Sequence, residues 1–173
     1  MVFAQHNIPH LFLKPGEMHF ATEPTLVSTL LGSCVAVVMY DPQTCVGAIS
    51  HCLLPAHRDR SCCECETFCR EAFRYVDCSI KRMLDEFCRN GVRTESLQVK
   101  LFGGSDMFSL KAGPGGKPTV GKQNIEKALH SLTNARLTLV ASDVGGLRGR
   151  KIYFYTHTGE VLLKRLNKQV DEE

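Results

Sequence analysis

Apolar residues recur along the chain in two patterns, short runs bounded by turn residues and longer stretches with helical spacing. The short runs are rich in β-branched and aromatic residues, which predicts strands over residues 17–21, 26–31, 35–40, 46–54, 97–102, 137–142, 151–156 and 160–166. Helical spacing predicts an amphipathic helix from Phe73 to Phe87, ended by Asn90-Gly91, and a second helix over 120–134. The second helix is expected to turn inward the side chains of Ile125, Ala128, Leu129 and Leu132.

Strands outnumber helices in this pattern, which predicts an α+β protein with a mostly antiparallel or mixed sheet system and helices outside it. The length of 173 residues fits one domain with a substantial core. Pro9, Pro15 and Gly16 interrupt any periodicity near the start, so residues 1–15 are expected to be a loosely ordered lead-in. Residues 167–173 are polar and are expected to form a frayed tail.

Composition and charge exclude several classes of partner. The chain is 43% apolar and 23% charged, which is typical of a globular protein. Its formal net charge of +3 is spread without Lys/Arg blocks, so no nucleic-acid partner is expected. No run approaches the roughly 18 apolar residues of a membrane span, and the first fifteen residues lack a continuous apolar segment. We therefore expect a cytoplasmic protein without membrane insertion.

Nine cysteines are unusual in a chain of this size. The odd count, without an apolar leader, favours reduced thiols over a disulfide framework. Clustered thiols could bind zinc or an iron-sulfur cluster, but the spacing in this cluster lacks paired Cys-x-x-Cys knuckles, and unliganded or redox-labile thiols are the alternative. The clustered residues are Cys62, Cys63, Cys65 and Cys69.

A hairpin is expected to bring one cysteine and one histidine together. Asp41-Pro42-Gln43-Thr44 is a turn-forming tetrapeptide between two β-prone runs. A four-residue turn there makes Tyr40 face Cys45, and the same register makes Cys34 face His51. Directly opposed residues on antiparallel strands have Cβ atoms about 5 Å apart, so this register predicts a thiol and an imidazole within reach of a hydrogen bond.

The Cys34–His51 pair has the chemistry of a thiol hydrolase. Only a thiolate attacks a carbonyl efficiently, and a neighbouring imidazole can take the thiol proton and later protonate a leaving amine. Gly32 and Ser33 precede the cysteine at an expected tight bend, where backbone amides are free to point at an oxyanion. On composition alone, the alternative is a buried cysteine and a half-buried histidine without a catalytic role.

Several motifs follow one another in the order typical of one protein family. They are Leu30-Leu31-Gly32-Ser33-Cys34-Val35-Ala36-Val37, Asp41-Pro42, Val46-Gly47-Ala48-Ile49-Ser50-His51, Arg74-Tyr75-Val76-Asp77, Phe102-Gly103-Gly104-Ser105, Gly121 with Asn124, and Asp143-Val144-Gly145-Gly146 with Arg148 and Arg150. Over residues 16–166 the chain resembles the CheD family of chemoreceptor glutamine deamidases. The resemblance implies a mixed β-sandwich with flanking helices and a cysteine hydrolase that converts protein-bound glutamine to glutamate and releases ammonia.

The resemblance also implies roles for individual residues. By position, Cys34 matches the family nucleophile and His51 its general base. The third catalytic residue of the family is typically a threonine six positions before the cysteine, which here is Ser28. Thr29 also carries a hydroxyl and is a possible substitute, and Ser33 is a candidate for positioning the oxyanion or substrate. No cofactor or metal is needed for this reaction.

Partners follow from the resemblance as well. The substrate would be the cytoplasmic helical region of chemoreceptors, and a CheC-type phosphatase would be a second partner. In the family, the region of Phe102, Gly103 and Gly104 lies near the partner surface, and the alternative is an ordinary strand-end turn with Phe102 in the core. Contact with an acidic receptor surface is one role for Arg148 and Arg150, and solvated charges are the default expectation. A non-catalytic regulator that docks on receptors and such a phosphatase, and a metal- or redox-sensing protein built on the cysteine cluster, are the alternatives.

Overall fold

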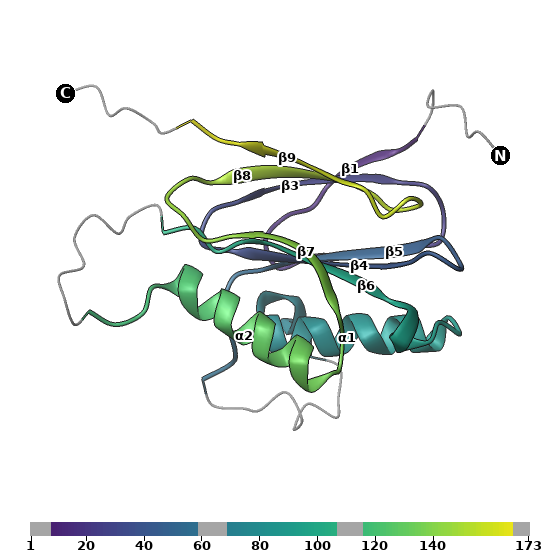
Figure 1. Cartoon of the computed structure of the whole chain (residues 1–173), viewed down its shortest axis with the longest axis horizontal. Helices are drawn as coiled ribbons and strands as arrows, with labels where there is room; N and C mark the ends of the chain where they lie inside the picture. The colour runs from purple at the N-terminus through teal and green to yellow at the C-terminus, as the bar shows by residue number, and fades with distance from the viewer. Residues whose placement is uncertain (1–7, 59–68, 107–115, 168–173) are drawn as a thin grey trace.

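Two stacked sheets and one layer of helices form the fold (Figure 1). The computed structural model describes residues 8–58, 69–106 and 116–167. Within these residues, nine strands form a four-stranded and a five-stranded sheet, here called the small sheet and the large sheet. The two α-helices lie against the outer face of the large sheet (Figure 1), and the prediction of an α+β sandwich is confirmed.

The small sheet has the order β1-β3-β8-β9. Its strands are β1 (His10–Phe12), β3 (Leu26–Leu31), β8 (Arg150–Tyr155) and β9 (Val161–Arg165). β1 runs parallel to β3, and the other neighbours are antiparallel. β1 lies where a loosely ordered lead-in was expected. The three-residue strand is too short for a periodic signal in the sequence, but the Leu13 side chain that follows it is buried.

The large sheet has the order β2-β5-β4-β6-β7. Its strands are β2 (Met18–Ala21), β5 (Val46–Cys52), β4 (Val35–Asp41), β6 (Gln98–Gly103) and β7 (Leu139–Val144). β7 is parallel to β6, and the other pairs are antiparallel. Every residue of β4 and β5 is buried, because the small sheet covers one face and the helices cover the other. Their unbroken apolar character in the sequence has this origin.

The helical layer consists of α1 (Val76–Arg89) and α2 (Val120–Asn134), with 3-10 turns at Ala72–Arg74 and Thr94–Ser96. α2 has the predicted bounds. Its buried face is formed by Gly121, Asn124, Ala128 and Leu132, whereas the Leu129 side chain, expected to point inward, is 42% exposed. No helix in the described part of the chain is long and apolar enough to cross a membrane.

The β4–β5 register differs from the predicted one by two residues. Val35 pairs with Cys52, and Ala36 rather than Cys34 faces His51. Asp41 stays in the strand, and its carboxylate accepts hydrogen bonds from the Thr44 backbone N–H at 3.0 Å and the Thr44 hydroxyl at 2.6 Å. Because side chains alternate with a period of two, this shift leaves Cys34 and His51 directed to the same side of the sheet.

Candidate active site

Cys34 lies where the chain passes from one sheet to the other. β3 of the small sheet ends at Leu31, and β4 of the large sheet begins at Val35. Gly32, Ser33 and Cys34 form the link, here called the cysteine turn. The Cys34 thiol is free and partly buried, and it packs against the apolar cluster between the two sheets. The side chain therefore faces the layer between the sheets.

Backbone hydrogen bonds from the end of β6 hold the cysteine turn. The Ser105 N–H donates to the Gly32 carbonyl at 2.9 Å, and the Gly104 N–H donates to the Cys34 carbonyl at 2.8 Å. At Gly103, with φ of +106°, a Cβ atom would lie 2.2 Å from the Cys34 carbonyl oxygen, so only glycine fits there. Phe102, Gly103 and Gly104, which the resemblance placed near a partner surface, are themselves buried beneath the turn.

His51 and Thr29 meet across the layer between the sheets. His51 belongs to β5 and is 2% exposed, while Thr29 belongs to β3 and is 0% exposed. The Thr29 Oγ1 atom lies 2.7 Å from His51 Nδ1, and the Thr29 hydroxyl also donates to the Leu13 carbonyl at 2.7 Å. A hydroxyl has a single proton, so Thr29 accepts from His51 Nδ1–H. The Nε2 atom of His51 is then left with its lone pair, as a general base requires.

Ser28 points away from this layer. Its hydroxyl lies 2.8 Å from His10 Nε2, and its neighbour in β8 is Tyr153. Successive side chains of a strand alternate between faces, so Thr29 shares the inner face with Val27 and Leu31 and Ser28 does not. The structure thus brings Thr29 to His51 and leaves Ser28 on the outer face. The remaining candidate, Ser33, has an exposed side chain.

Burial sets the protonation of Cys34 and His51. Desolvation lowers the pKa of His51 to about 4, partly opposed by the negative charge of Glu17. Desolvation also raises the pKa of the Cys34 thiol, partly opposed by its own backbone N–H. Both shifts favour the uncharged forms, so near neutral pH Cys34 is a neutral thiol and His51 a neutral imidazole.

The free energy of unfolding should depend on pH through His51. Its pKa is about 4 when folded and near the ordinary 6.5 when unfolded, so the unfolded chain binds the extra proton between these values. We expect stability to fall by about 3 kcal/mol as the pH decreases through this window, and His51 to add no pH dependence above it. Urea unfolding at about pH 7 and pH 4.5 measures how much unfolding free energy wild type and His51→Gln each lose over this range, and the variant should lose less. An equal loss in the two proteins would contradict this assignment.

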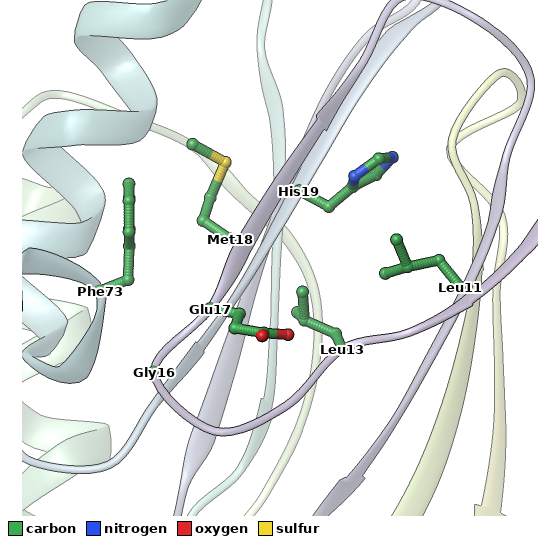
Figure 2. A pocket seen from close by; sticks show the side chains of 7 residues that line it. All are labelled: Leu11, Leu13, Gly16, Glu17, Met18, His19 and Phe73. Carbon is green, nitrogen blue, oxygen red and sulfur yellow. The ribbon is translucent and has the colours of Figure 1, made fainter.

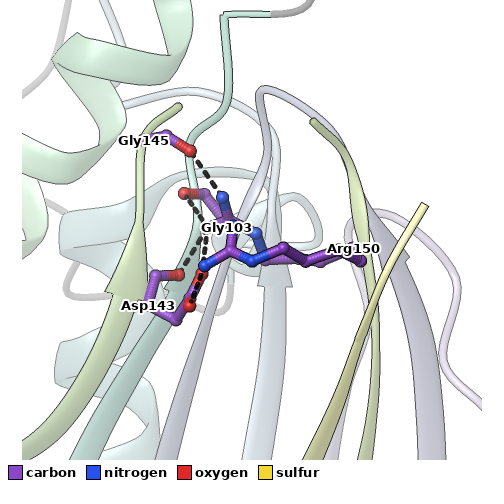
Figure 3. A network of polar contacts seen from close by, with 5 residues as sticks. Gly103, Asp143, Gly145 and Arg150 are labelled. Atoms are coloured by element: carbon purple, nitrogen blue, oxygen red, sulfur yellow. Dashed lines mark hydrogen bonds and ion pairs between the residues drawn. The ribbon is translucent and has the colours of Figure 1, made fainter. Parts of the chain in front are cut away.

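Arg150 was missed as a structural residue of the site, because arginine in this segment was expected to be solvated. Its side chain is 0% exposed and reaches from β8 to the ends of β6 and β7 (Figure 3). It donates to the carbonyls of Gly103 at 2.9 Å and of Asp143 and Gly145 at 2.5 Å, and pairs with the Asp143 carboxylate at 3.2 Å. Arg150 thereby supports the segment beneath Cys34.

The sequence held a signal for the inward direction of Arg150. Its side chain lies on the same face of β8 as Ile152 and Phe154, which are both buried.

A shallow hollow of about 430 Å³ lies between the edge strands of the two sheets (Figure 2). It is lined by Leu11, Leu13, Gly16, Glu17, Met18, His19 and Phe73. Cys34 and His51 are not part of its lining. Two residues of this lining also bind the site: the Leu13 carbonyl accepts from the Thr29 hydroxyl, and the Glu17 carbonyl accepts from the His51 backbone N–H at 3.0 Å.

The described residues contain no group of three or more side chains that could hold a metal ion. Of the predicted cysteine cluster, Cys62, Cys63 and Cys65 lie outside the described residues, and Cys69 is a partly buried free thiol. The hypothesis of a metal site there stays a prediction.

A family profile and two relatives in sequence agree on one family. A family profile described as CheD chemotactic sensory transduction matches residues 54–165. A Geobacter sulfurreducens protein named "Probable chemoreceptor glutamine deamidase CheD 2" is 52% identical over 95% of this chain and 96% of its own. A Maridesulfovibrio salexigens protein named "Probable chemoreceptor glutamine deamidase CheD" is 38% identical over 96% and 97%. The chain therefore belongs to the CheD family.

Proposed function

We propose that this protein is a chemoreceptor glutamine deamidase that hydrolyses the side-chain amide of selected receptor glutamines. The observation that carries the mechanism is the Thr29–His51 hydrogen bond, which leaves Nε2 of His51 unprotonated in the layer that also receives Cys34. The activity is the one named for the relatives that align with nearly the whole chain. The substrate region is the cytoplasmic helical part of the receptors, which places the protein in the cytoplasm. A CheC-type phosphatase partner stays a prediction.

The reaction proceeds in two steps. His51 Nε2 takes the thiol proton while Cys34 Sγ bonds to the amide carbon, and the carbonyl electrons move onto the oxygen. The proton passes to the amide nitrogen, the C–N bond breaks, ammonia leaves and a thioester remains. His51 then takes a proton from water, whose oxygen attacks the thioester carbon. The C–S bond breaks, His51 returns the proton to the Cys34 sulfur, and glutamate leaves with the thiol restored. Thr29 keeps the imidazole in the required tautomer through both steps.

Ammonia release from a purified receptor cytoplasmic fragment tests the proposed function. We expect wild-type protein to release ammonia in proportion to the glutamines modified. A fragment whose modified glutamines are replaced by glutamate is the matched control and should release none. Binding of the fragment without ammonia release would point instead to a regulator that docks on receptors without turnover.

Removing the Thr29 hydroxyl should impair catalysis, whereas removing the Ser28 hydroxyl should not. Thr29→Val keeps the side-chain shape but leaves Nδ1–H of His51 without its acceptor, so we expect the turnover rate to fall about ten- to hundred-fold. Ser28→Ala should stay within about twofold, because that hydroxyl contacts His10 on the outer face. Initial rates measure both effects, and thermal unfolding of each variant controls for stability. A large loss in Ser28→Ala with little in Thr29→Val would reverse the assignment.

A further inference from the structure

One buried side chain of α2 holds the peptide bond that precedes Cys34. Asn124 is 0% exposed, and its Nδ2 atom donates to the carbonyls of Ser33 and Leu53, both at 3.0 Å. The two bonds use both amide hydrogens. A flipped amide would set Oδ1 against two carbonyl oxygens, so the assignment of nitrogen and oxygen is determined by the contacts. Asn124 thus joins the cysteine turn to the chain just after β5, the strand that carries His51.

The geometry of this peptide bond decides where the Cys34 N–H points. Within the described residues every peptide bond is trans, and in a trans peptide the carbonyl and the N–H point in opposite directions. α2 lies on the outer face of the large sheet (Figure 1), and the Ser33 carbonyl points toward it. The Cys34 N–H is therefore directed away from the helix, to the side of the sheet where the thiol packs.

The described part of the chain shows no competing backbone acceptor for this N–H outside its regular strands and helices. Among the backbone hydrogen bonds of the described residues outside regular strands and helices, none has the Cys34 N–H as donor. The same N–H lies near the thiol because both belong to Cys34, and it lowers the pKa of the thiol against the effect of burial. A donor beside Sγ without a backbone acceptor in the described residues is suitably placed for an oxygen on the carbon that Sγ attacks.

We propose that Asn124 is a positioning residue that orients the Cys34 N–H as a hydrogen-bond donor to the oxyanion formed when Cys34 attacks a carbonyl. The inference deepens the proposed function, because it takes Cys34 as the nucleophile. The oxyanion forms as the Sγ–C bond is made and the carbonyl electrons move to oxygen, and it disappears when the leaving group departs. Without the clamp of Asn124, the Ser33–Cys34 peptide can rotate, and the donor is no longer fixed.

Two reagents separate an effect on the oxyanion from an effect on the thiol. Acetylation by p-nitrophenyl acetate transfers the acetyl group to Sγ through a tetrahedral oxyanion and releases p-nitrophenolate. Alkylation by iodoacetamide forms an S–C bond at a saturated carbon and releases iodide, so no oxyanion arises. Both rates are measured at the Cys34 peptide by mass spectrometry, in wild type, Asn124→Asp and Asn124→Leu. Asn134→Asp is the matched control, because Asn134 is an exposed residue at the end of the same helix.

We expect both Asn124 variants to slow acetylation about ten- to hundred-fold while alkylation stays within about twofold. Thermal unfolding of each variant verifies that it is folded in the assay, because an unfolded chain would also lose the fixed donor and mimic the effect. An unchanged ratio of the two rates in both variants would overturn the inference, whether the individual rates fall together or not. Deamidation of a receptor fragment by wild type is measured in parallel. Its absence would count against the proposed function without altering the ratio.

Discussion

Replacing Cys34 by alanine is expected to abolish ammonia release while leaving the fold and receptor binding intact. The Cys34 side chain packs in the layer between the sheets that also holds the Thr29–His51 pair, and without Sγ no thioester can form. We expect a loss of at least about a thousand-fold in turnover. Alanine fits the same turn, because the contacts that hold it come from backbone carbonyls of Gly32 and Cys34.

The matched control for this variant is Cys88→Ala, which removes an exposed thiol at the end of α1. It should keep wild-type turnover. Steady-state ammonia release measures activity, and a binding assay with the receptor fragment measures docking. Turnover by Cys34→Ala near the wild-type rate would place the nucleophile elsewhere in the chain.

Replacing His51 by alanine should have the second largest effect. Burial keeps the Cys34 thiol protonated near neutral pH, so the reaction depends on a base that removes its proton at the moment of attack. Loss of that base should lower turnover about a hundred- to ten-thousand-fold. Raising the pH should partly restore the rate, because hydroxide increases the thiolate fraction of Cys34.

Initial rates across pH measure this effect. His130→Ala is the control, because His130 is exposed on α2 and should not affect the rate. Activity of His51→Ala that equals wild type at neutral pH would show that another group serves as the base.

The sequence predicted the layers of the fold and the pairing of β4 with β5, but not the register of that pair or the short strand β1. The hairpin of β4 and β5 was expected from its turn residues, but its register was wrong by two, because the Asp41 side chain closes the turn from within the strand. The face shared by Cys34 and His51 was still correct, since an even shift preserves alternation. β1 gave no periodic signal over three residues.

Individual contacts of the site needed the three-dimensional arrangement. Its position in the sequence relative to Cys34 favoured Ser28 as the third residue. In the structure Thr29 contacts His51 instead, because Thr29 and Leu31 belong to the alternate residues of β3 that point into the layer between the sheets. The same reasoning applies to Arg150, which alternates with buried apolar residues of β8, and to Asn124, which lies on the buried face of α2. In each case the available signal was a polar residue at a position that shares its periodicity with buried apolar residues. Its hydrogen-bond partners, however, come from segments distant in the sequence.

Hydrolysis of receptor glutamines is measured by mass spectrometry of a receptor cytoplasmic fragment incubated with wild-type protein, in ordinary and in ¹⁸O-labelled water. We expect specific glutamines to become glutamates and the new carboxylate to carry oxygen from the solvent, because water hydrolyses the thioester. Unchanged receptor peptides after incubation with protein that binds the fragment would contradict this expectation and leave a docking protein without glutamine hydrolysis.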